Sequence, residues 1–291
     1  MGQLINPASD LGRALERLNG GADETTGIVR YTPDFWVHHA ITEIYDSFGE
    51  VVEVKPKSLV KFGQFINLGD GFETVQSQGG NEDYQTANTI DTVSSTDASA
   101  SAVVVIEGQT VDDSGNFTFV EQSLALNGQA KVALSTPLAR CTRVCNASSP
   151  DFFGDVYVYR DGATTGGVPD DAATIHAVAL ATDQQTEKCS TTISSADYWI
   201  VTKWQASVNR RNTASVDFKL QIRRKNSVFR TAADLSLSNA SGSHEATLRP
   251  YLIVPRNSDV RVVASSSASG TSVSAAVGGV LCTIKADTDG T

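Results

Sequence analysis

The stretch VDFKLQIRRKNSVFR, from Val216 to Arg230, sets the expectation for the fold. Its first half alternates polar residues with the apolar residues Val216, Phe218, Leu220 and Ile222. Successive side chains of a β-strand point to opposite faces, so this pattern predicts a strand with one buried face and one wet face. Parallel strands that are buried on both faces are instead apolar throughout. The stretch therefore predicts an antiparallel sheet whose outer face is open to solvent or to partners.

Short apolar runs separated by turn residues continue from residue 51 to near the end of the chain. Examples are the runs SAVVVIEGQTV and FTFVEQSLAL, which are separated by the turn DDSGN. Short strands at this spacing predict a β-sandwich or a barrel. With 40% hydrophobic residues, the 291-residue chain can form a substantial core. We expect an all-β protein with two antiparallel, jelly-roll-like β-sandwich domains.

Charge is distributed unevenly along the chain. Residues 1–196 hold 11 Lys and Arg against 26 Asp and Glu, whereas residues 197–285 hold 12 against 5. Such asymmetry between halves suggests two separately folded regions. We therefore predict an N-terminal arm over residues 1–50, an acidic sandwich over residues 51–190 and a basic sandwich over residues 191–291.

The predicted arm contains a short amphipathic segment. In NPASDLGRALERLNGG, the residues Leu11, Leu15 and Leu18 fall on one face of a helix of two to three turns. A helix this short is not stable alone, so we expect it to pack on a neighbouring subunit. Trp36 lies in a second element, read as a helix or a strand, and is a further interface candidate.

Two basic clusters lie at successive predicted turns. The interface candidates in them are Arg210 and Arg211, followed by Arg223, Arg224 and Lys225. One interpretation is that they are solvated turn residues. The other is that they meet the acidic flank of a neighbouring subunit, where charge complementarity would orient assembly more than it adds affinity.

Catalytic signatures are missing from the sequence. It has no GxSxG elbow, P-loop, HExxH motif or GxGxxG motif placed between a strand and a helix. His38 and His39 are adjacent, so they diverge and do not face one metal unaided. His176 lies in an apolar run and is expected to be a satisfied core histidine. His244 and Glu245 would need a nucleophile that the sequence does not identify.

Acidic residues offer two weak alternatives. The segment Asp112–Asn116 has the oxygen density of a calcium loop, but it lacks the rest of an EF-hand, and a Gly-containing hairpin turn is the preferred explanation. Carboxylates that could form a glycosidase pair are present at Asp70, Glu73, Glu82 and Asp83. Neither pattern is specific, and we expect no catalytic residue, metal or cofactor.

Four cysteines occur without zinc-site spacing, and we expect free thiols, buried or half-buried, at Cys141, Cys145, Cys189 and Cys282. No apolar run reaches the roughly 18 residues that span a bilayer, and no signal-peptide pattern is visible. The formal net charge of −10 disfavours direct binding to nucleic acid. We expect synthesis in the cytoplasm and no membrane or nucleic-acid partner.

Several segments resemble the β-sandwich modules of tailed-bacteriophage virion proteins. They include YWIVTKWQASVNRRNTASVDFKLQIRRKNSVFRTA and PYLIVPRNSDVRVVASSSASGTSVSAAVGGVL in the second region. In the first region, GDVYVYRDG and the run from TVSSTDASA to LARCTRVCNAS are similar. The resemblance implies a structural component of a virion that contacts capsid, portal or tail subunits and forms homo-oligomers. The resemblance does not indicate which residues of this chain form a binding site.

Three classes of function remain open. The first is a virion structural protein, with head decoration preferred to a collar, adaptor, tail or fibre-base role. The second is a carbohydrate- or receptor-binding module, with stacking surfaces from Tyr198, Trp199, Trp204 and Tyr251. Trp199 and Trp204 are five apart, so a regular strand would send them to opposite faces. The third is an enzyme, which the missing motifs disfavour.

Overall fold

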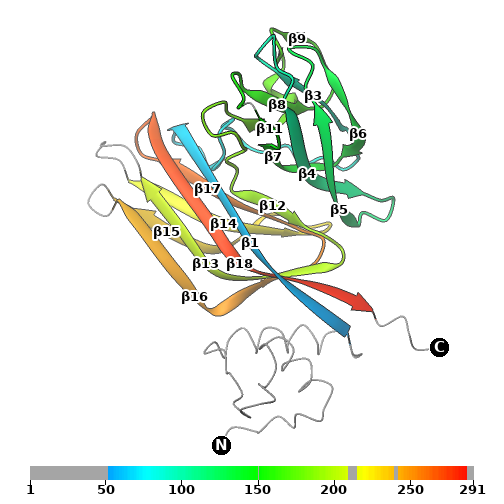
Figure 1. Ribbon diagram of the computed structural model, residues 1–291. Helices are drawn as coiled ribbons and strands as arrows, with labels where there is room; N and C mark the ends of the chain where they lie inside the picture. The colour runs from blue at the N-terminus through cyan, green and yellow to red at the C-terminus, as the bar shows by residue number, and fades with distance from the viewer. Residues whose placement is uncertain (1–51, 150, 209–214, 239–241, 287–291) are drawn as a thin grey trace, which may run out of the picture.

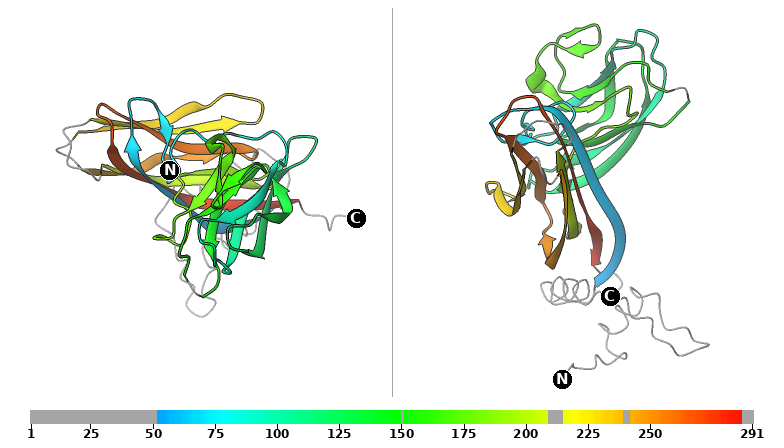
Figure 2. Two further views of the ribbon diagram at one scale, coloured as in Figure 1. Left: turned by 90° about the horizontal axis from the view of Figure 1, so that it is seen from above. Right: turned by 90° about the vertical axis from the view of Figure 1, so that its left-hand side faces the viewer.

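The computed structural model describes residues 52–149, 151–208, 215–238 and 242–286. In these residues every regular element is a strand except the short 3-10 helix η1 (Ala172–Thr174). The strands form two β-bodies, an upper one formed by the green strands and a lower one that includes both ends of the described chain (Figure 1). The right-hand view of Figure 2 shows the same division. The all-β prediction is confirmed, and the predicted helical arm lies outside the described residues.

The first sandwich is the upper body and packs two antiparallel sheets face to face. One sheet has the order β11–β8–β3–β6 and the other β5–β4–β7, with a separate β9–β10 ribbon. The strands are β3 (Ile90–Ser95), β4 (Val103–Val111), β5 (Phe117–Ala125), β6 (Val132–Leu138), β7 (Arg140–Asn146), β8 (Val156–Tyr159), β9 (Thr164–Thr165), β10 (Val168–Pro169) and β11 (Ile175–Ala179). Its core contains the fully buried residues Ile106, Val144 and Val158.

The second sandwich also has two antiparallel sheets. One has the order β1–β18–β13–β16, and the other has the order β12–β17–β14–β15 with β2 added on β17. The strands are β1 (Val52–Leu68), β2 (Glu73–Thr74), β12 (Ser190–Ile193), β13 (Asp197–Val208), β14 (Val216–Arg224), β15 (Arg230–Leu237), β16 (Ser243–Val254), β17 (Ser258–Ser266) and β18 (Thr271–Ala286). The two sheets enclose a second core around Trp199, Phe218 and Val262.

Strand β1 joins the beginning of the described chain to its end. It runs antiparallel to β18, from the pair Val52 and Ala286 to the pair Leu68 and Thr271. The first sandwich is therefore inserted between β2 and β12 of the second. The predicted 51–190 segment thus begins with a strand whose sheet partner lies in the 191–291 segment. The division into two independently folding domains stays a prediction.

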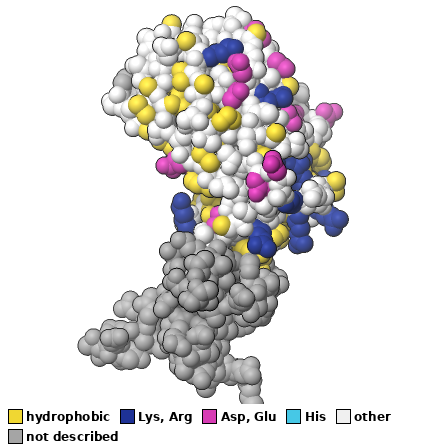
Figure 3. All heavy atoms as spheres, turned by 90° about the vertical axis from the view of Figure 1, so that its right-hand side faces the viewer, with side chains coloured by type: hydrophobic (Ala, Val, Ile, Leu, Met, Phe, Trp, Pro, Cys, Tyr) yellow, Lys and Arg dark blue, Asp and Glu magenta, His cyan; other side chains and the backbone are white. Residues whose placement is uncertain are grey.

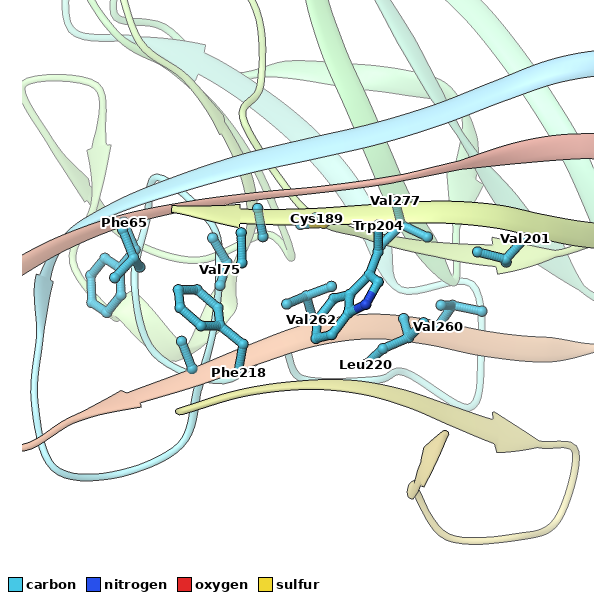
Figure 4. Packing of buried hydrophobic residues seen from close by; sticks show 14 of the residues in the cluster. Phe65, Val75, Cys189, Val201, Trp204, Phe218, Leu220, Val260, Val262 and Val277 are labelled. Carbon is cyan, nitrogen blue, oxygen red and sulfur yellow. The ribbon is translucent and has the colours of Figure 1, made fainter. Parts of the chain in front are cut away.

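Strand β14 has the predicted face assignment. Val216, Phe218 and Leu220 are fully buried, whereas Asp217 on the opposite face is exposed. Figure 4 shows Phe218 and Leu220 directed into the core near Trp204 and Val262. Burying side chains of this size contributes about 1.5–3 kcal/mol each, so the apolar face of the strand is a main source of stability for this sandwich.

The prediction that Trp199 and Trp204 face opposite sides of β13 is wrong. Both side chains are buried in the same core, at 0% and 2% exposure. The register of β13 shifts between Val201 and Lys203 against both neighbouring strands. This bulge inserts one residue into the strand. Side chains beyond it therefore point to the opposite face from the one expected for a regular strand. Neither tryptophan is therefore available to stack on a sugar.

Candidate functional site

Buried charges join the two sandwiches along a surface that we call the seam, centred on Asp259 of β17. The Asp259 carboxylate accepts hydrogen bonds from Arg140 Nε at 2.9 Å and from Arg223 Nε at 3.0 Å. It also accepts a bond from the Thr192 hydroxyl at 2.7 Å. The side chains of Arg140 and Asp259 are 4% and 6% exposed. The seam thus links β7 of the first sandwich to β12, β14 and β17 of the second.

Aromatic rings cover the guanidinium groups of the seam. The Tyr84 ring centroid lies 5.0 Å from Arg140 Cζ and 4.3 Å from Arg223 Cζ. The Phe229 ring lies 5.1 Å from that of Tyr84 and 4.8 Å from Arg223 Cζ. Such cation–π contacts strengthen where water is excluded. Burial raises the pKa of Asp259, but the charges of Arg140 and Arg223 outweigh it and hold that pKa below its ordinary value.

A second buried ion pair joins Lys188 to Glu82. Lys188 Nζ is 2.8 Å from Glu82 Oε1, and the two side chains are 1% and 4% exposed. The ammonium also donates to the carbonyls of Cys141 at 2.9 Å and His176 at 2.8 Å. The Ser190 hydroxyl donates to Glu82 Oε2 at 2.8 Å. The three protons of the ammonium group thus have three acceptors, and Glu82 is an ion-pair partner instead of half of a glycosidase pair.

The turn Asp112–Asn116 docks against the second sandwich. The Asp112 carboxylate accepts bonds from Asn116 N at 2.7 Å and Asn116 Nδ2 at 3.0 Å. The Lys225 ammonium donates to the Ser114 carbonyl and, at 3.3 Å, to Asn116 Oδ1. Asn257 Oδ1 accepts from Phe117 N at 2.9 Å. The segment is therefore a hairpin turn that binds the ammonium group of Lys225. Its oxygens are not arranged as in a calcium-binding loop.

Three of the predicted interface residues lie in the described part of the chain. Arg223 forms an ion pair with Asp259, and Lys225 donates a hydrogen bond to the Asp112–Asn116 turn. Both side chains therefore have partners within the chain. Arg224 is exposed. A contact with another subunit stays a prediction for these three. The remaining candidates lie outside the described residues, and they are Leu11, Leu15, Leu18, Trp36, Arg210 and Arg211.

Sequence reasoning missed the seam, because its partners are far apart along the chain. Arg140 and Asp259 are separated by 119 residues, and Lys188 and Glu82 by 106. One signal was present. Arg140 is a single cation within the otherwise uncharged run LSTPLARCT. A buried cation needs a buried partner.

His176 is a core residue, as predicted, but it is not satisfied. It is 1% exposed, and its Nε2 has no hydrogen-bond partner among the described residues. Burial, and then the nearby charge of Lys188, lower the pKa of His176 to about 3. The ring therefore stays neutral near pH 7. His38 and His39 lie outside the described residues.

The outer side of the sheet β1–β18–β13–β16 carries exposed apolar side chains beside a groove. We call this surface, defined by Val60, Phe62 and Ile66, the β1 face. These side chains are 55%, 40% and 65% exposed. The adjacent groove has a volume of about 460 Å³, and its lining includes Ser274 and Ala276. Grouped apolar exposure of this kind marks interaction surfaces.

The groove contains His244 and Glu245 but shows no catalytic geometry. The two residues are consecutive in β16, so their side chains point to opposite faces. The nearby hydroxyls of Ser207 and Ser274 bond to each other at 2.6 Å. No group of three His, Cys, Asp or Glu in the described part of the chain can hold a metal ion.

The cysteine prediction is confirmed. All four thiols are free, with Cys145 half-buried and the other three buried. Burial raises the pKa of Cys141 and of Cys189 to about 12. These two thiols are therefore protonated and unreactive near pH 7. Within the described residues, no helix is long and apolar enough to cross a membrane.

Comparisons with known proteins give weak structural neighbours. No protein-family model matches the chain, and no curated protein matches its sequence. A structure of infectious bursal disease virus, Gt strain, matches with a TM-score of 0.21 and 8% identity, covering 82% of this chain and 72% of that chain. The VP2 subviral particle of the same virus gives 0.19 and 11%, covering 81% and 73%. At these TM-scores the backbones do not superpose as a whole, so a shared fold is not established.

Proposed function

We propose that this protein is a non-enzymatic structural subunit of a phage virion, and specifically a head decoration (cement) protein. The observation that carries the proposal is the contrast between the seam and the β1 face. The charged groups of the seam are paired inside the molecule, whereas large apolar side chains are exposed along one strand. This arrangement suits a molecule that works by packing against others.

The seam supports a structural role because it holds two sandwiches in one orientation. Arg140 and Asp259 bridge the sandwiches in one place, and Lys225 bridges them at the Asp112–Asn116 turn. Buried polar networks of this kind require a single geometry to be satisfied. A lattice component needs such a fixed shape, since each surface must meet its neighbour in register.

The virion setting is supported by the resemblance of several segments to tailed-phage virion modules. The partners in this proposal are other virion proteins and further copies of the chain. The arm over residues 1–50, with its apolar stripe at Leu11, Leu15 and Leu18, is proposed to dock on a neighbouring subunit. A collar, adaptor or tail role would use the same surfaces at another position.

The direct test is quantitative mass spectrometry of purified particles from infected cells. We expect the chain in particles at a fixed copy number relative to the major capsid protein. Particles formed without the chain should contain DNA but lose it sooner on heating. Absence of the chain from purified particles, or a variable trace amount, would overturn the proposal.

A further inference from the structure

We propose that copies of this chain associate head to tail, with the turn between β14 and β15 of one copy seated in a hollow at the tip of the first sandwich of the next. We call the turn Arg224–Arg230 the basic turn. The tip hollow is lined by Ser101, Asp151, Phe152 and Phe153. The inference deepens the assembly role and rests on it for its biological setting.

The basic turn presents an apolar side chain among cations. Val228 is 68% exposed, so its side chain is free to contact a partner. Arg224, Lys225 and Arg230 around it are also exposed. An apolar anchor with a charged surround is the arrangement of a small docking contact, in which the anchor is desolvated and the charges set orientation.

The basic turn is held in one conformation before any partner arrives. Ser227 N donates to the Arg224 carbonyl at 3.0 Å, which closes the turn. Asn226 takes the left-handed conformation with φ of 57°, which asparagine tolerates better than most residues. The Lys225 ammonium fixes the turn to the Ser114 carbonyl. A preorganised turn loses less entropy on docking.

The tip hollow lies at the other end of the first sandwich. It opens between the loop before β4 and the loop after β7, whereas the seam lies at the far ends of these strands. Its volume is about 160 Å³. Phe152 is buried in its wall, Phe153 is 77% exposed, and Asp151 and Ser101 are exposed at its rim. The hollow thus combines an apolar wall with an acidic rim.

Hydrogen bonds within the chain also hold the walls of the tip hollow. Gln184 Oε1 accepts from Phe152 N at 2.7 Å and fixes the loop that carries the phenylalanines. On the other wall, Asp97 Oδ1 accepts from Ser99 N at 2.9 Å and from the Ser99 hydroxyl at 2.8 Å. Both surfaces of the proposed contact, the basic turn and the tip hollow, are therefore held by hydrogen bonds within the chain.

Charge complementarity identifies a second copy as the occupant. Residues 90–186 contain 12 acidic and four basic residues, whereas residues 188–286 contain five acidic and 13 basic residues. Lys and Arg side chains gather over the second sandwich in Figure 3. Two basic turns would repel each other, but a basic turn and an acidic tip attract. The contact is therefore heterologous, and repeating it gives a ring or a filament.

Sedimentation velocity of the full chain tests the contact. At about 50 mM salt we expect concentration-dependent association that weakens at about 500 mM, where the screening length is only a few ångströms. Val228→Asp should raise the dissociation constant about tenfold or more, as loss of a central anchor does. Lys57→Asp reverses an exposed charge elsewhere and should leave association unchanged.

A charge exchange between two variant chains decides the geometry. The first carries Arg224→Asp and Arg230→Asp, and the second carries Ser101→Lys and Asp151→Lys. In a solution of either variant alone, the turn and the tip hollow carry charges of the same sign. Each variant alone should therefore be monomeric. Mixed together, every contact between unlike chains pairs opposite charges, so association should return.

Three results would overturn the inference: a monomeric wild-type chain at low salt, variants that associate like the wild type, or a mixture that stays monomeric. All substituted side chains are exposed, and circular dichroism melting checks that each variant is folded. Presence of the chain in particles is measured separately. A chain that enters particles without associating in solution would contradict the head-to-tail contact and leave the proposed function standing.

Discussion

At the scale of single residues, Phe218 tests the register of β14. Its side chain is fully buried between the two sheets, so Phe218→Asp would place a carboxylate without a partner in an apolar core. We expect a loss of several kcal/mol in the free energy of unfolding, because burying an unpaired charge is costly. Gln221→Asp, on the opposite face of the same strand, should change it little. Equal melting temperatures for the two variants would mean that the strand presents the other face to the core.

His176 gives a pH-dependent prediction. Its pKa of about 3 in the folded protein is below the ordinary value of 6.5, so the unfolded chain gains a proton first as the pH falls. Stability from this residue is therefore complete above about pH 6.5 and declines towards pH 3. Between pH 7 and pH 5 the loss should be about 2 kcal/mol.

The measurement is urea unfolding of the wild type and of His176→Gln at both pH values. Glutamine cannot take up the proton, so the variant should lose less stability than the wild type over this interval. The difference between the two proteins removes the contribution of other titrating groups. Parallel pH profiles would show that the ring is not held neutral by burial.

At the scale of elements, the seam couples β7, β14 and β17 through Asp259. Asp259→Asn would leave the buried Arg140 and the half-buried Arg223 without a counter-charge. Removing one partner of a buried pair typically costs about 3–5 kcal/mol. Asp161→Asn is the matched control, because it breaks the exposed pair with Lys131 and should have little effect.

Differential scanning calorimetry can also show how the seam acts. The wild type should unfold in a single transition, because the two sandwiches stabilise each other. Asp259→Asn should lower the melting temperature and separate the transitions of the two sandwiches. If Asp259→Asn and Asp161→Asn melt alike, the seam does not couple the bodies.

The same scale shows what a sequence can reveal. Alternation identified β14 and β17 because one buried face imposes a two-residue period. It did not identify the bulge in β13, which reverses the parity between Trp199 and Trp204. The pairing of β1 with β18 was also out of reach, since it joins segments at opposite ends of the chain. Local periodicity does not encode such long-range pairing, and the ion pairs of the seam depend on it.

At the scale of the whole molecule, the protein is one shaped body whose surfaces are proposed to have separate tasks. The seam fixes the two sandwiches, whereas the β1 face is proposed to pack against other virion proteins, and the basic turn and tip hollow are proposed to join copies of the chain. The β1 face shares no residue with the seam, the basic turn or the tip hollow. The β1 face therefore can be tested without disturbing the others.

The measurement that tests the central claim most directly is particle incorporation of the Phe62→Asp/Ile66→Asp variant. Both side chains are exposed on β1, so the variant should fold and melt like the wild type. We predict that it is depleted from purified particles when it competes with the wild-type chain, as counted by quantitative mass spectrometry. Equal incorporation of the variant and the wild type would contradict the claim that this face carries the function.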